Sequence, residues 1–490
     1  MPSGTLTVAS PAAPPHLDVH QAVSEALASL GPGLAYSRLL RLATGPEVAI
    51  PSMQVECDLC QSWRMVDPRI FEFTLRPEAQ WHPVPPVNGR QVTAQDVVFS
   101  YQRLSTPGWP NAGLVHGVEG WTAVDERTVR VVLQHPDADF LRSLADGHAK
   151  IVAPEVVQQY GDLKEAPVVG TGPWVWEGKP AVGDSSFVAS SAYFEPGVPG
   201  VQRLVIRVMP DTQTIFAALA TGAVDVGRVE AGRWDTLKGL GVKSVVAPRM
   251  GTGALLALSA ALEERVRVAF FLSLDPWRSL EDVWGGQGIV GLGAPVAQSD
   301  WLLSREEMGR SFNQPERARG MLAEVAGGGP PPLELLVADF GEPYLAYGEA
   351  VREQLARTGF HVRLQVVNRR EYAERVWGRR DFQAVIGAVP PASTTNGFLL
   401  SMLHSQGQWS ITGHGYQRLD QLVEEQAAEY DQARRGELVR EVQSFVLDRG
   451  LLFMPAVSVE RWAFWPQVGG FYPNLAGSEY SFWARVRVAG

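Results

Sequence analysis

The chain has 490 residues, with 43 lysines and arginines against 53 aspartates and glutamates, which gives a formal net charge of −10. This acidic balance, without a basic stripe along the chain, argues against nucleic acid or an anionic membrane surface as a partner. Hydrophobic residues make up 45% and charged residues 20%, which is typical of a globular protein. The length corresponds to two lobes of uneven size or about three domains.

Strands and helices alternate along the chain, which predicts the α/β class. Short apolar or period-two runs predict strands at 6–10, 71–76, 128–133, 204–208, 333–337, 362–367 and 384–386. Helical spacing and capping residues predict helices at 94–101 after a Thr93 cap, 212–221 after Asp211 or Thr212, 263–274, 315–325, 343–358 and 419–447. We expect the last helix to break at 434–436, and the glycine and proline run at 327–332 to form a loop.

No segment predicts a membrane span, because the longest apolar run, 254–262, is shorter than the roughly 20 residues that a helix needs to cross a bilayer. No secretory signal is expected within the sequence either, since its first basic residue is Arg38. The opening residues 1–4 read as an artificial start placed ahead of a mature domain.

The two cysteines, Cys57 and Cys60, form a single CxxC pair. A structural zinc site would need two further ligands, and a thioredoxin-like site would need a helix directly after the pair. The sequence therefore favours a local disulfide or two buried thiols over redox or metal chemistry. The nine histidines are scattered and form no ligand pair, so no metal is predicted.

No catalytic motif is present: there is no GxSxG elbow, no P-loop and no dinucleotide-binding glycine fingerprint. We expect no enzymatic activity and no cofactor. Tryptophan is unusually frequent, at fifteen residues. Most should pack in cores, but Trp109, Trp377 and Trp409 lie in polar or glycine-rich surroundings and are candidate ligand contacts.

One stretch of sequence, 57–104, resembles the extracellular solute-binding proteins of ABC importers, family 5, which include dipeptide, oligopeptide and nickel binders. The resemblance is carried by Phe73-Thr74-Leu75-Arg76-Pro77, by Trp81-His82, and by Thr93-Ala94-Gln95-Asp96-Val97-Val98-Phe99-Ser100-Tyr101. Segments at 17–20, 170–174, 217–225 and 264–275 follow in the order that the family shows.

This resemblance implies a two-lobed periplasmic-binding-protein fold (type II, cluster C), with an extra subdomain inserted in the first lobe. Lobe I would comprise residues 1–42, 166–249 and 455–490, the inserted subdomain 43–165, and lobe II 250–454. The two crossings, near 249–253 and 453–456, would act as the hinge, and ligand would bind in the cleft between the lobes.

The sequence departs from the family pattern where peptide binders carry a carboxylate for the peptide α-ammonium. The matching stretch, 386–399, contains no Asp or Glu. A buried ammonium without a compensating charge is costly, so we expect a peptide-like or oligosaccharide-like solute rather than a peptide with a free amino terminus. The candidate ligand-binding residues are Ser10, Trp109, Met250, Gly251, Trp377, Val389, Pro390, Ser393, Thr394, Asn396, Phe398, Trp409 and His414.

The predicted protein is thus a monomeric extracytoplasmic receptor that captures a small organic solute by hinge closure and delivers it to an ABC permease. Three alternatives remain. One is a nickel or metal-chelate binder that uses His404 or His414, and the others are a hydrolase on the same scaffold and a sensor domain released from its transporter.

Overall fold

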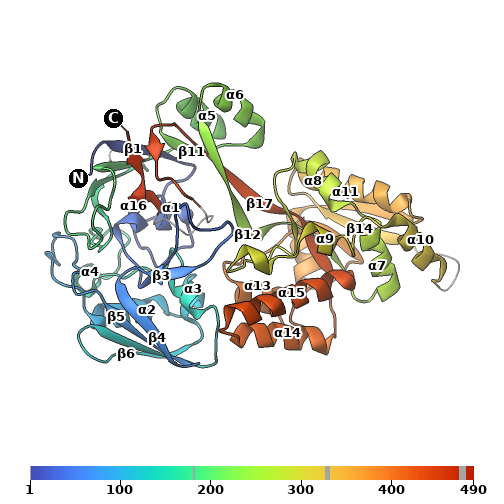
Figure 1. Cartoon of the computed structure of the whole chain (residues 1–490), viewed down its shortest axis with the longest axis horizontal. Coiled ribbons are helices and arrows are strands. Elements are labelled where there is room, and N and C mark those ends of the chain that lie inside the picture. Colours follow the sequence, from blue (N-terminus) through green and yellow to red (C-terminus); the bar gives the residue numbers. More distant parts are fainter. Residues whose placement is uncertain (1, 180–182, 326–331, 474–481, 490) are drawn as a thin grey trace. The chain divides into compact units, whose positions relative to one another are not determined.

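The computed structural model describes residues 2–179, 183–325, 332–473 and 482–489. It is a mixed α/β structure, as predicted. The chain divides into two compact units, unit 1 (Met1–Ala247 and Glu460–Gly490) and unit 2 (Pro248–Val459). Both boundaries fall inside strands, namely β12 (Lys243–Leu258) and β17 (Leu452–Phe464) (Figure 1). Among the described residues, no helix combines the length and apolar character that a membrane span needs.

The main sheet of unit 1 has the strand order β17-β11-β1-β10-β9-β8, in which β1 pairs in parallel with β10 and β11. The predicted strands at 6–10 and 204–208 are confirmed as β1 and β10. Helix α5 begins at the Asp211 cap, whose carboxylate accepts hydrogen bonds from Gln213 N and Thr214 N. The strands are β1 (Thr5–Ser10), β8 (Trp174–Gly178), β9 (Ser185–Ala189), β10 (Arg203–Val208) and β11 (Val226–Arg228).

A second sheet in unit 1 has the order β4-β5-β7-β6. It contains β4 (Cys60–Asp67), β5 (Ile70–Leu75), β6 (Val118–Ala123) and β7 (Thr128–Leu133). Helix α2 (Ala94–Leu104) packs on it and begins where predicted, because Asp96 Oδ2 accepts the Thr93 N–H at 2.9 Å. Two of the predicted strands are confirmed here.

A disulfide joins Cys57 to Cys60, which is one of the two states that the sequence left open for this pair. It links the end of β3 (Val55–Cys57) to the start of β4. The enclosed Asp58 is 3% exposed, and its carboxylate accepts the Arg38 N–H at 2.8 Å. The residues after Cys60 form a strand rather than a helix, which is the context expected of a structural pair.

The sheet of unit 2 has the order β15-β14-β16-β12-β17, with β13 also paired to β17. Strands β14 (Leu333–Ala338), β15 (Val362–Val367) and β16 (Ala384–Ala388) are parallel to one another and confirm three predicted strands. Alternation along β14 divides the core, because Leu335 and Val337 join one apolar cluster while Leu336 and Ala338 join another.

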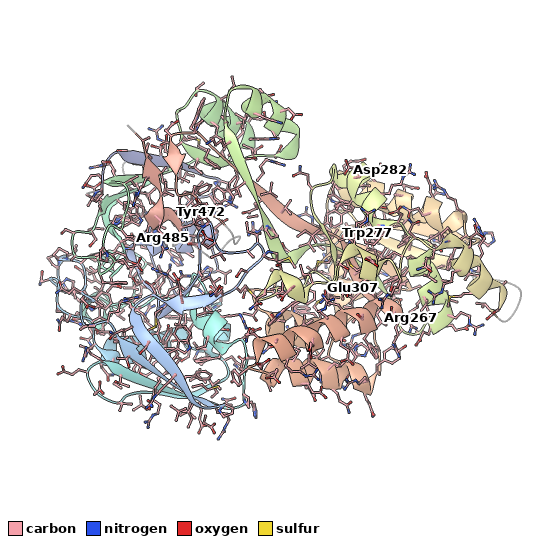
Figure 2. The ribbon with its side chains drawn as sticks, in the orientation of Figure 1. Arg267, Trp277, Asp282, Glu307, Tyr472 and Arg485 are labelled. Atoms are coloured by element: carbon pink, nitrogen blue, oxygen red, sulfur yellow. A yellow bond between two sulfur atoms is a disulfide. The ribbon has the colours of Figure 1, made fainter. Side chains whose placement is uncertain are left out.

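Helices cover both faces of this sheet. One cluster packs against α7 (Glu264–Leu272), α10 (Pro315–Ala323) and α11 (Glu342–Ala356), and the other against α13 (Thr395–Met402), α14 (Gln417–Ala428) and α15 (Gln432–Asp448). Figure 1 shows α14 and α15 side by side. Arg267, marked in Figure 2, is 2% exposed and ties α7 to the end of α15 by donating to the carbonyl of Arg449 at 3.2 Å.

The predicted helix break at 434–436 is wrong. The break lies at 429–431, because Asp431 caps α15 by accepting the Arg434 N–H, and Gly436 lies inside that helix. The ring of Trp301 occupies the space that a side chain at 436 would fill: a Cβ there would lie 2.6 Å from Trp301 Cδ1. The predicted loop at 327–332 lies almost entirely outside the described residues.

The remaining helices and strands are shorter or peripheral. They are α1 (Glu25–Ala28), α3 (Phe140–Leu144), α4 (Pro154–Tyr160), α5 (Thr212–Ala220), α6 (Trp234–Gly239), α8 (Pro276–Trp284), α9 (Arg305–Met308), α12 (Arg369–Tyr372), α16 (Phe482–Arg485), β2 (Leu40–Leu42), β13 (Ile289–Gly291), β18 (Val468–Gly469) and β19 (Arg487–Val488).

Candidate functional site

The carboxyl ends of three parallel strands meet at one edge of the unit 2 sheet. Ala338 at the end of β14 is in register with Val367 at the end of β15, and Val337 is in register with Ile386 of β16. Loops that leave the carboxyl ends of parallel strands are the usual place for ligand contacts in open α/β sheets. The candidate loop 389–394 follows β16 directly, so it lies at this edge.

A row of aromatic rings extends from this edge. Phe340 contacts Tyr372, Tyr372 contacts Trp377, and Trp377 contacts Trp409, with ring centroids 5.5, 6.1 and 5.7 Å apart and planes near perpendicular. Edge-to-face contacts of this kind hold rings in fixed orientations. The structure therefore brings together Trp377 and Trp409, two of the predicted residues, and leaves both half-buried.

The second ring of the row, that of Tyr372, is anchored to the end of β16. Tyr372 is 3% exposed, and its hydroxyl donates to the carbonyl of Ala388 at 2.7 Å. Burial raises the pKa of this phenol, so it stays protonated and keeps donating. The position of the row is thereby tied to the end of β16.

The loop 389–394 rests on Gly251. The Ala392 N–H donates to the Gly251 carbonyl at 3.3 Å, and the Gly251 N–H donates to the Gly293 carbonyl at 2.7 Å. Gly251 has φ +77, and a Cβ there would lie 2.0 Å from the Ala392 carbonyl oxygen. Only glycine fits this position without moving the loop.

The other predicted residues of the loop differ in exposure. Ser393 is exposed, Pro390 and Thr394 are half-buried, and Val389 is 9% exposed. The Thr394 hydroxyl accepts the Gly397 N–H at 3.0 Å and so caps α13. Met250, one residue before Gly251, is half-buried against the apolar cluster that packs on α13, α14 and α15.

Three predicted residues have their side chains engaged inside unit 2 instead. Phe398 is 0% exposed and belongs to the core. Asn396 Oδ1 accepts hydrogen bonds from Gln426 Nε2 at 2.9 Å and Arg435 Nη2 at 2.8 Å. His414 Nε2 lies 2.5 Å from the Leu403 carbonyl, and burial lowers its pKa. Internal partners occupy these groups, so we leave the three residues out of the proposed site.

Two predicted residues belong to unit 1. Ser10 is buried at the carboxyl end of β1, where its hydroxyl donates to the Ala12 carbonyl at 2.8 Å. Trp109 is half-buried, and the guanidinium of Arg103 lies 4.7 Å from its ring centroid. The structure of unit 1 does not join these two residues into one cluster, and their contact with ligand stays a prediction.

The histidines named for a metal alternative have other partners. His404 Nε2 lies 3.0 Å from Glu424 Oε1, and His414 is the buried residue described above. Across the described part of the chain, no group of three or more His, Cys, Asp or Glu side chains is placed to hold a metal ion.

The charge at the strand ends comes from residues that the sequence reasoning missed. Arg369 is the first residue of α12, two positions after the end of β15; it is exposed and holds its guanidinium 5.0 Å from the Phe340 ring centroid. No carboxylate among the described residues forms an ion pair with it. Asp339, which follows β14, accepts the Gly341 N–H at the start of α11. Phe340, Arg369 and Tyr372 could have been found by inspecting the residues after each predicted parallel strand.

Comparison with known proteins agrees with this architecture. A family model described as "Bacterial extracellular solute-binding proteins, family 5 Middle" matches residues 54–410. The chain belongs to this family. Members of the family bind small solutes and work with ABC permeases. The resemblance expected from the sequence is thus confirmed.

The three relatives reported below are distant but are matched over nearly their whole length. The probable di/tripeptide-binding protein 5 of Pseudomonas aeruginosa (strain UCBPP-PA14) is 25% identical, over 97% of this chain and 94% of that protein. Among solved structures, HbpA2 from Haemophilus parasuis matches with a TM-score of 0.85 at 20% identity, covering 99% of this chain and 100% of that one.

The periplasmic murein tripeptide-binding protein MppA, in its unliganded open form, matches with a TM-score of 0.84 at 18% identity, covering 99% of this chain and 97% of that one. These likenesses confirm the predicted fold, that of the periplasmic binding proteins.

Proposed function

We propose that this solute-binding protein captures a peptide-like solute that lacks a free α-ammonium and carries an acidic end. The observation that carries the proposal is the charge at the carboxyl ends of β15 and β16. The stretch 386–399 holds no carboxylate, whereas Arg369 presents a cation that has no acidic partner among the described residues. The relatives named for di- and tripeptides support the peptide-like backbone.

The energetics favour such a solute over an ordinary peptide. An ammonium placed against the loop 389–394 would lose hydration without gaining a counter-ion from the stretch 386–399, which costs several kcal/mol in a buried site. A carboxylate would instead gain a charge-assisted hydrogen bond from Arg369, worth about 1.5–3 kcal/mol. The half-buried rings of Trp377 and Trp409 and the exposed hydroxyl of Ser393 supply apolar and neutral polar contacts.

The proposal includes a role without catalysis, as a monomer outside the cytoplasm. An oligosaccharide-like solute is the second candidate, because aromatic faces and neutral hydroxyls also suit sugars. The metal-chelate and hydrolase alternatives gain no support from the described residues, where the candidate histidines are engaged with Glu424 and the Leu403 carbonyl.

The first experiment offers the protein an equimolar pool of tripeptides, half of them N-acetylated, and identifies the retained species by mass spectrometry. We expect the N-acetylated acids to be retained, to raise the melting temperature and to change the tryptophan fluorescence. Retention of unblocked tripeptides would overturn the proposed charge preference. Retention of no peptide, with binding of maltotriose, would favour the oligosaccharide.

A matched pair of variants tests the acidic end of the solute. Arg369→Gln should weaken binding of a retained acid by tenfold or more, as expected for loss of one charge-assisted hydrogen bond. Arg363→Gln changes an exposed arginine in β15, the strand that precedes Arg369, and should leave binding unchanged. Equal affinities for the acid and its C-terminal amide in the unmodified protein would contradict the assignment of Arg369.

A further inference from the structure

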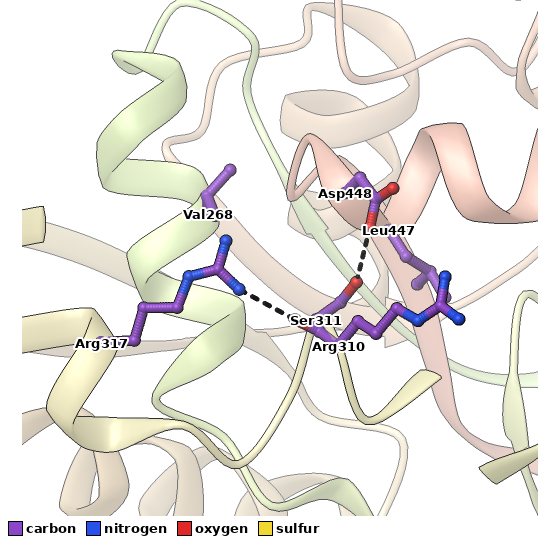
Figure 3. A pocket seen from close by; sticks show the side chains of 6 residues that line it. All are labelled: Val268, Arg310, Ser311, Arg317, Leu447 and Asp448. Atoms are coloured by element: carbon purple, nitrogen blue, oxygen red, sulfur yellow. Dashed lines mark hydrogen bonds between the residues drawn. The ribbon is translucent and has the colours of Figure 1, made fainter. Parts of the chain in front are cut away.

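Unit 2 contains a hollow that none of the predicted ligand-binding residues lines. Its volume is about 340 Å³, and it lies between α7, the segment that precedes α10, and the end of α15 (Figure 3). The lining side chains are Val268, Arg310, Ser311, Arg317, Leu447 and Asp448.

This hollow lies at the opposite end of the sheet from the proposed solute site. The hollow adjoins α7, the helix that follows β12. The last residue of β12, Leu258, is in register with Ala384 at the start of β16. The solute site is at the other end of β16, after Ala388. Five strand residues separate the two ends, or roughly 13–17 Å at about 3.3 Å per residue. The two sites are therefore distinct.

The charge in the hollow is not compensated. Neither Arg310 nor Arg317 has a carboxylate within ion-pair distance among the described residues, whereas the neighbouring Arg319 pairs with Glu316. Arg317 makes only long contacts, at 3.5 Å, to the carbonyl of Arg310 and to Gln314 Oε1. Two guanidinium groups against one carboxylate leave a net charge of about +1.

The carboxylate in the hollow already has a partner. Asp448 Oδ1 accepts the Ser311 hydroxyl at 3.0 Å, which holds the end of α15 against the segment before α10. Figure 3 shows the guanidinium groups of Arg310 and Arg317 on either side of Ser311. Val268 and Leu447 add apolar surface. The open donors of the hollow thus come from the two arginines and exceed in charge the single carboxylate of Asp448, beside a small apolar wall.

We propose that this hollow is a second binding site, for a small organic carboxylate with a short apolar body. The carboxylate would be held by Arg317 and Arg310, and its apolar part would pack on Val268 and Leu447. A volume of 340 Å³ equals that of roughly ten water molecules at about 30 Å³ each, which is room enough for a small acid. Because such a ligand bridges α7, the segment before α10 and α15, it stabilises unit 2.

Calorimetric titration of the full chain with butyrate tests the site, with butyramide as the uncharged match and chloride at equal ionic strength as the salt control. We expect saturable binding of butyrate only. Arg317→Gln and Arg310→Gln should each weaken it by tenfold or more. Arg319→Gln, which removes an arginine already paired on the same helix, should bind butyrate like the unmodified protein.

Three results would overturn the proposal: no saturable binding of butyrate, an equal response to butyramide, or an equal loss in Arg319→Gln. Because the site is separate from the strand ends, Arg369→Gln should leave butyrate binding unchanged. A failure here therefore does not bear on the proposed solute, and a failure of the solute proposal does not bear on this site.

Discussion

At the scale of single residues, the candidate loop depends on one backbone position. Gly251 combines a left-handed φ of +77 with a carbonyl oxygen 2.0 Å from where a Cβ would stand. The first feature alone costs an L-residue about 1–2 kcal/mol. The second requires movement of the backbone at Ala392, which supports the loop between β16 and α13.

Gly251→Ala should therefore lower the free energy of unfolding by more than strain alone explains, and should weaken solute binding because the loop moves. Gly413→Ala is the matched control, since Gly413 has φ +67 and open space around its Cβ position. We expect Gly251→Ala to lose more free energy of unfolding than Gly413→Ala, by at least about 1 kcal/mol, when both are measured by urea unfolding. Equal losses would show that the loop adapts freely.

At the scale of secondary-structure elements, α14 and α15 show how tertiary packing overrides local preference. Gly436 lies in the interior of α15, where glycine is unfavourable by about 1 kcal/mol relative to alanine. The helix tolerates it because the ring of Trp301, which is 2% exposed, packs directly against the backbone there. Without a side chain at 436, the segment that carries Trp301 approaches α15 closely.

This packing predicts opposite effects for two identical substitutions. Gly436→Ala should destabilise the protein by roughly 1–3 kcal/mol, since the new methyl group overpacks the contact with Trp301. Gly320→Ala, in α10 with open space around it, should stabilise by about 1 kcal/mol through helix propensity alone. The melting temperatures of both variants, compared with that of the unmodified protein, test this prediction. Stabilisation by Gly436→Ala would contradict the packing argument.

At the scale of the whole molecule, two buried histidines in unit 1 link stability to pH. Burial lowers the pKa of both His20 and His82 to about 4. In His20, Nε2 donates to the Lys150 carbonyl at 2.9 Å, and Nδ1 faces Arg103 Nη1 at 3.0 Å, so a second proton finds no acceptor. The folded protein thus keeps this ring neutral where the unfolded chain, with a pKa near 6.5, takes up a proton.

The sign of the effect follows from these values. Between pH 6.5 and 4 the unfolded state binds more protons than the folded state, so stability is complete above that window and falls as the pH drops through it. From pH 7 to pH 5, each histidine should remove about 2 kcal/mol from the free energy of unfolding. Urea unfolding at both values measures this loss, and His82→Gln should reduce it by about half. A variant as acid-sensitive as the unmodified protein would exclude His82 as a cause.

Local sequence was sufficient for part of this structure. The strands at 333–337, 362–367 and 384–386 and the Thr93 cap follow from alternation and capping chemistry, which act over a few residues. Close spacing favoured a disulfide or two buried thiols for Cys57 and Cys60, and the structure shows the disulfide. The order of motifs along the chain was also sufficient for the family. The sequence also shows that 386–399 contains no carboxylate. It therefore predicts that an ammonium bound against this stretch would lack a counter-ion from it.

Only the tertiary structure decided which side chains remain available at the site. Asn396 and His414 look like ligand contacts in the sequence, yet partners from α14, α15 and the Leu403 carbonyl occupy them. Arg369 looks like one of many surface arginines until the parallel register places it beside Phe340. The physical reason is common to these cases: hydrogen-bond partners and neighbouring rings come from segments about 10 to 40 residues away, and no local pattern encodes them.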